Sequence, residues 1–73
     1  MTPSLLRQIW SQVEETQTNV ILQLDDSSLA GLILNQIQRQ HLLNSSEADQ
    51  VIQYIYSKLS LIRDLALSRI ASF

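Results

Sequence analysis

The side chains able to do acid–base or metal chemistry in this sequence are seven carboxylates and one histidine. Glu14 with Glu15, and Asp25 with Asp26, form two pairs of neighbours in the chain. Neighbouring side chains on a helix diverge by about 100°, so neither pair converges on one ligand. His41 has no second histidine or glutamate at metal-ligand spacing. We therefore expect solvated or helix-capping carboxylates, a structural histidine and no metal site.

Nucleophilic and phosphate-binding chemistry lacks its usual residues as well. The sequence has no cysteine and no Gly-x-Ser-x-Gly motif, and its serines fall at predicted helix starts or on polar faces. A glycine-rich phosphate loop is impossible with the single glycine, Gly31. We assign no catalytic residue and no cofactor, and we predict that the chain is not an enzyme.

Aromatic and basic side chains are the remaining candidates for ligand binding. The aromatic residues are Trp10, Tyr54, Tyr56 and Phe73. At helical spacing such residues are more typical of core or interface anchors than of a stacking platform. Lys58, Arg63 and Arg69 straddle the apolar stripe of a predicted helix and form no single basic face, which favours a flanking role over nucleic-acid or membrane binding.

The composition points towards close approach of another protein surface. Only 16% of the residues are charged, against about 25% in typical globular domains. Nine glutamines and ten serines supply most of the polarity. A surface of neutral amides and hydroxyls repels a second copy weakly. The net charge of -2 gives no basic patch for nucleic acid.

The chain length predicts one domain, 1–73, whose core needs support. A chain of 73 residues buries only about 60 to 65% of the surface that its unfolded form exposes. Without cysteines or metal ligands, oligomerisation is the remaining means of stabilisation. No apolar run reaches the 18 or so residues of a membrane span, and no signal peptide is evident. We expect a cytoplasmic protein.

One glycine and one proline favour helices over hairpins, and the first helix is predicted over residues 3–23. Pro3 suits a first helical turn. Apolar residues before and after a central polar run then share one face, which favours a continuous helix. The face consists of Leu6, Ile9, Trp10, Val13, Val20, Ile21 and Leu24. A short strand around residues 20–22 is the alternative.

Two further helices follow, over residues 27–40 and 46–71. Asp25 or Asp26 can cap the first of these. Gly31, in its middle, either permits close approach of a neighbouring helix or is merely tolerated. Asn44 and Glu47 have the spacing of a capping box at the start of the last helix, with Ser45 as an alternative cap.

The last helix carries more apolar surface than the two shorter helices can cover. Its seam consists of Ala48, Ile52, Ile55, Leu59, Ile62 and Ala66, joined by Val51 and Ile70. Tyr54, Leu61 and Leu65 form a second stripe to one side of the seam, while Tyr56 and Leu67 lie on the other. We therefore predict a three-helix antiparallel bundle that forms a homodimer through this helix.

Gln17 stands out within the first predicted helix because the 100° spacing places it in the middle of the apolar face. A polar residue in a helical seam can fix register or oligomeric state. The other interpretation is local exposure of the helix at this point. The predicted interface residues are Tyr54, Leu61, Leu65, Leu67 and Gln17.

The stretches LDDSSLAGLILNQI and YIYSKLSLIRDLA resemble a group of small, all-helical, uncharacterised proteins of cyanobacteria. The resemblance covers roughly residues 20–67. It implies a cytoplasmic helical protein and carries over no catalytic or binding residues.

From these features we predict a non-enzymatic protein–protein interaction or assembly module. The alternative is a small nucleic-acid-binding or transcriptional regulator. A helix-turn-helix would then be formed by the second helix, the HLLNSS connection and the start of the third helix. Glu47 and Asp49 at that start would repel phosphates. Peripheral membrane association is disfavoured by the low charge of the last helix.

Overall fold

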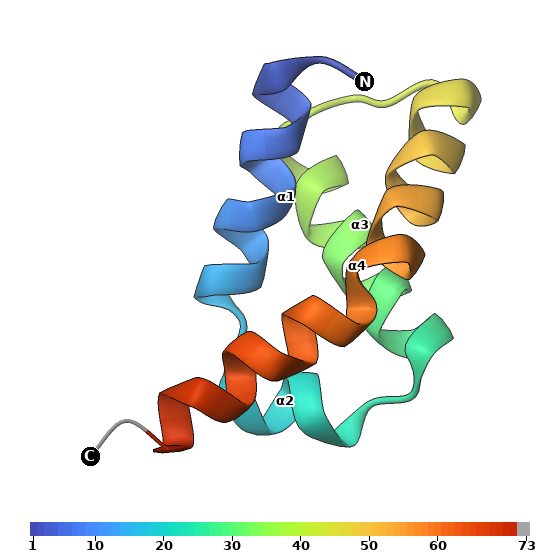
Figure 1. The fold of residues 1–73 in the computed structure, drawn as a ribbon. Coiled ribbons are helices and arrows are strands. Elements are labelled where there is room, and N and C mark those ends of the chain that lie inside the picture. Colours follow the sequence, from blue (N-terminus) through green and yellow to red (C-terminus); the bar gives the residue numbers. More distant parts are fainter. Residues whose placement is uncertain (72–73) are drawn as a thin grey trace.

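The computed structural model describes residues 1–71, and over this range the chain is all-helical (Figure 1). Its helices are α1 (Pro3–Glu15), α2 (Thr18–Gln23), α3 (Asp26–Gln40) and α4 (Ser45–Ala71). In Figure 1, α1 and the first half of α4 flank α3, and the second half of α4 turns across the bundle beside α2. The all-helical prediction is confirmed, but four helices form where three were predicted.

The predicted continuous helix over residues 3–23 is wrong, because the chain is extended at Thr16 and Gln17. The hydroxyl of Thr16 donates to the carbonyl of Gln12 over 2.6 Å, while the backbone N–H of Thr16 bonds the same carbonyl at 3.0 Å. A β-branched residue with a side chain that bonds the preceding turn favours the end of a helix over its interior. The strand alternative is also wrong, since residues 20–22 are helical.

The predicted helix starts are confirmed to within one residue. The Asn44 side chain accepts from the N–H of Glu47 at 2.8 Å, and the Glu47 carboxylate accepts from the N–H of Asn44 at 3.2 Å, as in a capping box. Asp25 caps α3 by accepting from the N–H of Ser28 at 2.8 Å. Hydrogen bonding by Ser28, through its side chain and then its backbone, lowers the pKa of Asp25.

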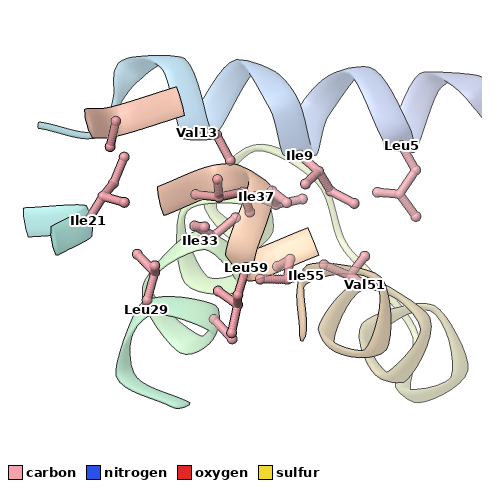
Figure 2. Close-up of a cluster of buried hydrophobic side chains, with 13 residues drawn as sticks. Leu5, Ile9, Val13, Ile21, Leu29, Ile33, Ile37, Val51, Ile55 and Leu59 are labelled. Atoms are coloured by element: carbon pink, nitrogen blue, oxygen red, sulfur yellow. The ribbon is translucent and has the colours of Figure 1, made fainter. Parts of the chain in front are cut away.

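The core is a single apolar cluster to which all four helices contribute (Figure 2). Its members are Leu5, Ile9, Val13, Ile21, Leu29, Ala30, Ile33, Ile37, Val51, Ile55, Leu59, Ile62 and Ala66. Of the predicted seam of α4, the buried residues are Val51, Ile55, Leu59, Ile62 and Ala66, whereas Ala48 and Ile52 are half-buried and Ile70 is 51% exposed. The difference at Ile70 shows that the seam narrows towards the end of the helix.

Gly31 does not mark a close approach between helices. A Cβ atom built at this position would have nothing within 4 Å, and the residue has no positive φ. Of the two interpretations of this glycine, simple tolerance within α3 agrees with the structure.

α4 changes direction near its middle (Figure 1). Close to this point the hydroxyl of Ser57 donates to the carbonyl of Tyr54 at 2.7 Å. Hydrogen bonds of this type, from a serine to the preceding turn, often bend helices. The bend lets the second half of α4 cross α2 while the first half packs on α3.

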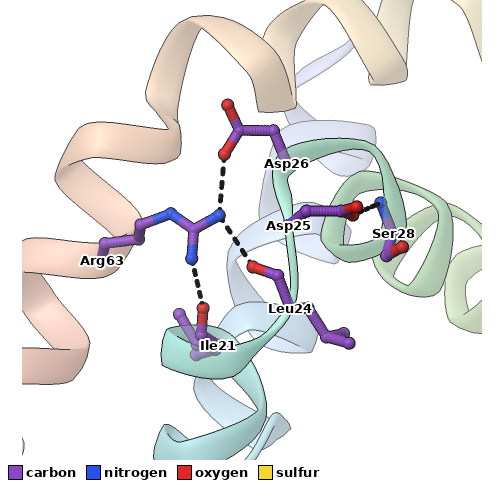
Figure 3. A network of polar contacts seen from close by, with 6 residues as sticks. All are labelled: Ile21, Leu24, Asp25, Asp26, Ser28 and Arg63. Atoms are coloured by element: carbon purple, nitrogen blue, oxygen red, sulfur yellow. Dashed lines mark hydrogen bonds and ion pairs between the residues drawn. The ribbon is translucent and has the colours of Figure 1, made fainter.

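The second half of α4 is attached to α2 by Arg63 (Figure 3). Its guanidinium donates to the carbonyls of Ile21 at 2.6 Å and Leu24 at 3.0 Å, and to the carboxylate of Asp26 at 2.7 Å. The last carbonyls of a helix have no partner within it, and a cation there also complements the helix dipole. Arg63 therefore caps the C-terminal end of α2 from another helix.

Arg69 does the same for the end of α1. It donates to the carbonyls of Thr16 at 3.0 Å and Val13 at 3.2 Å, and lies 3.5 Å from the hydroxyl of Thr18. The two extended residues between α1 and α2 thus have their polar backbone partly satisfied by α4. Arg63 and Arg69 therefore hold the C-terminal ends of α2 and α1 against α4.

Candidate interaction surface

The second half of α4 exposes more large apolar side chains than it buries. Over residues 61–71 only Ile62 and Ala66 are buried. In the same segment Leu61, Leu65 and Leu67 are 46%, 42% and 51% exposed. The structure thus places the three predicted interface leucines at the surface, on the part of the helix that packs mainly on the short α2.

These leucines lie on two sides of the helix. Leu61 and Leu65 are four residues apart and therefore neighbours on one side of the buried seam, which we call the leucine flank. Leu67 falls on the other side, near Ile70. The predicted interface residues therefore do not form one surface, and the leucine flank is the better candidate because of what precedes it along the helix.

Tyr54 lies two helical turns before Leu61, on the same side of α4, but it is mainly an intramolecular contact. Its hydroxyl accepts a hydrogen bond from Nε1 of Trp10 at 3.0 Å, and the two rings meet edge to face with centroids 6.4 Å apart. Lys58 Nζ lies 5.9 Å from the centre of the Tyr54 ring. The Trp10–Tyr54 pair joins α1 to α4, and no local sequence pattern predicts a contact between residues so far apart.

An open recess of about 440 Å³ lies over this aromatic pair. We call it the apolar recess, and it is lined by Leu6, Arg7, Trp10, Ser11, Glu14 and Tyr54. Leu6 and Trp10 are half-buried, so their exposed portions form its floor together with Tyr54. Leu61 follows Tyr54 by seven residues, so the leucine flank lies on the same side of α4 as Tyr54, beyond the bend of the helix.

Gln17 does not belong to this surface. It is exposed, lies outside both α1 and α2, and makes no side-chain capping hydrogen bond. The break in the helix removes it from the apolar face that a continuous helix would have given it. Of the two interpretations of this residue, local exposure agrees with the structure.

The basic, acidic and histidine candidates form no metal-binding cluster within residues 1–71. Arg63 and Arg69 contact backbone carbonyls, which the flanking interpretation did not foresee. His41 is exposed at the end of α3. In this part of the chain, no three histidine, aspartate or glutamate side chains gather as a metal site requires. Phe73, one of the four aromatic candidates, lies outside the described residues.

Fold and surface together define a small all-α domain with an apolar flank beside an aromatic recess. Among the described residues no helix combines the length and apolar character needed to cross a membrane. Comparisons with protein families, curated proteins and solved structures give no match to this chain. The resemblance to small helical proteins of cyanobacteria therefore stays a prediction.

Proposed function

We propose that this protein is a non-enzymatic interaction module that works by self-association, with the leucine flank of α4 as the centre of the interface. The observation that carries the proposal is the change in burial along α4. Its second half exposes Leu61 and Leu65 and buries only Ile62 and Ala66. Contiguous apolar side chains on a small protein are more often an interaction surface than an accident of composition.

The leucines alone are too small an interface. Full burial of a leucine contributes about 1.5–3 kcal/mol, so completing the burial of a half-exposed one contributes about 1 kcal/mol. Four such leucines across a twofold axis then give about 4 kcal/mol, at the lower end of the estimated cost of association. A stable complex must therefore also cover the apolar recess, where Trp10 and Tyr54 offer aromatic surface.

A second copy of the chain is the partner that the charges favour. Around the apolar recess and the leucine flank lie both signs of charge, from Arg7, Glu14 and Lys58. A twofold interface places each patch against its own copy, so a rim of mixed sign can pair cations with anions. The low net charge of -2 adds little general repulsion between copies.

The test is the mass of the protein in solution, measured by light scattering after size exclusion. We expect twice the 8.3 kDa chain mass at micromolar concentration. A double variant, Leu61→Glu with Leu65→Glu, is expected to be monomeric and to keep its helical circular dichroism, because both side chains are already half-exposed. A wild-type monomer at all accessible concentrations would contradict the proposal.

Leu42→Glu is the matched control for that experiment. Leu42 is fully exposed on the connection between α3 and α4, away from the leucine flank. The same change of leucine to glutamate should therefore leave the dimer intact. Leu67→Glu tests the opposite side of α4, and loss of the dimer in this variant alone would move the interface there.

A nucleic-acid-binding role has less support from the structure. The start of α4, which would serve as a recognition helix, carries Glu47 in a capping box and the exposed Asp49. Arg63 and Arg69 direct their guanidinium groups at backbone carbonyls of the same chain. Protein–protein association is therefore the function that we retain.

A further inference from the structure

A second recess, between α1 and α3, is polar and has no part in the proposed interface. We call it the polar recess; its volume is about 260 Å³ and it is lined by Gln12, Glu15, Gln36, Arg39 and Gln40. It shares no residue with the apolar recess. Gln12 and Trp10 are two positions apart on α1, so their side chains point to nearly opposite sides of that helix.

Gln12 is the unusual member of this group. It is only 4% exposed, yet the described part of the chain offers its side chain no hydrogen bond. A carboxamide has two N–H donors and an acceptor oxygen, and buried groups of this kind nearly always have partners. None of the described side-chain nitrogen or oxygen atoms is both sealed from solvent and without a partner. The amide of Gln12 therefore opens towards the recess.

The other side chains add a carboxylate, a guanidinium and two more amides around the same space. Glu15 follows Gln12 by one turn of α1, and Gln36, Arg39 and Gln40 share one side of α3 at spacings of three and four residues. Glu15 and Arg39 form no ion pair with each other. A charge of each sign is thus available to a ligand that enters between the two helices.

From this arrangement we propose that the polar recess binds a small zwitterion of the α-amino acid class. Its carboxylate would pair with Arg39, its ammonium group with Glu15, and a polar side chain would bond the amide of Gln12. A simple anion would meet Glu15, and a simple cation would meet Arg39. The volume of about 260 Å³ is below the range of about 300–1,000 Å³ typical of drug-sized ligands, which fits a molecule of this size.

The experiment is a titration of the full chain with L-glutamine up to about 10 mM, followed by nuclear magnetic resonance. The side-chain NH₂ signals of Gln12, Gln36 and Gln40 should shift and saturate. N-acetyl-L-glutamine amide lacks both charges of the zwitterion and should give no saturable shift. If neither L-glutamine nor any other standard amino acid shifts these signals, the proposal is wrong.

Arg39→Gln removes one charge from the recess at an exposed position, so the variant should fold. It should weaken binding at least tenfold, as loss of a charge-assisted hydrogen bond does. Arg7→Gln makes the same change on α1, outside the polar recess, and should leave the affinity unchanged. Equal affinities of the Arg39→Gln variant and the wild type would overturn the proposal, as would equal losses in the two variants.

Discussion

The two halves of α4 differ in how they are held to the rest of the molecule. Over residues 45–60 the helix buries Val51, Ile55 and Leu59 in the core, and Tyr54 adds a bonded aromatic contact to α1. Over residues 61–71 the buried set shrinks to Ile62 and Ala66. The first half of α4 is thus packed against the core over a wide face, whereas the second half is packed against it only along a narrow strip.

Polar contacts replace apolar burial in the second half. Arg63 and Arg69 together reach four backbone carbonyls of α1, α2 and the connections that follow these helices. Hydrogen bonds from a charged donor are roughly twice as strong as neutral ones and are directional. A segment can therefore be positioned firmly while its apolar side chains remain available to a partner.

The largest expected effect comes from removing apolar volume in the first half. Ile55 is fully buried, so Ile55→Ala should lower the free energy of unfolding by about 2–5 kcal/mol. Leu67→Ala, in the second half and outside the leucine flank, should lower it by less than about 1 kcal/mol, because the side chain is half-exposed. Urea unfolding followed by circular dichroism, at one fixed protein concentration, measures both. Similar losses in the two variants would remove the contrast between the halves.

A smaller loss is expected when one arginine contact of the second half is removed. Arg63→Met keeps an apolar stem but loses the bonds to Ile21, Leu24 and Asp26, at about 1.5–3 kcal/mol for a hydrogen bond to a charged group. The side chain is 25% exposed, which favours a value near the lower limit. The same unfolding measurement applies, with Arg39→Met at an exposed position of α3 as the matched control.

Asp26→Asn separates the carbonyl contacts of Arg63 from its ion pair. The side chain of Asp26 is 65% exposed, and pairs at such sites contribute about 0–1 kcal/mol. If the Asp26 variant lost as much stability as Arg63→Met, the capping of α2 would not be the main contribution of this arginine.

The smallest effect is expected at the break between α1 and α2. Gln17 is exposed and outside both helices, so Gln17→Leu should change the free energy of unfolding by less than about 0.5 kcal/mol. Light scattering should give the same mass as for the wild type. A marked gain in stability with altered assembly would show that this residue acts in an interface.

The helix starts were predictable because their chemistry is local. Asn44 with Glu47, and Asp25 with Ser28, are pairs three residues apart, so the sequence displays each capping side chain together with the residue whose backbone N–H donates to it. The exposed leucines of α4 were predictable for a related reason. The helical spacing of apolar residues within this one helix shows more apolar surface than the two shorter predicted helices can cover. Both predictions needed nothing beyond neighbouring turns.

The break at Thr16 was not predictable from the same pattern. The apolar phase of residues 6–24 continues across it, and one contact that supports it comes from Arg69, 53 positions away. The contact between Tyr54 and Trp10 was not predictable for the same reason, because the two residues are 44 positions apart. The polar recess was missed because Gln12 looks like any surface glutamine until α3 lies beside it.

The dependence of α2 on Arg63 and Arg69 has a consequence for the order of folding. A helix of six residues is far below the about 12–15 needed for marginal stability alone, and α2 buries only Ile21. The two arginines approach from 39 to 56 positions downstream, and they bond the carbonyls of Ile21, Leu24, Thr16 and Val13. Loop closure must come before these bonds form. α2 is thus a late product of chain closure, completed only when the far end of the molecule has returned.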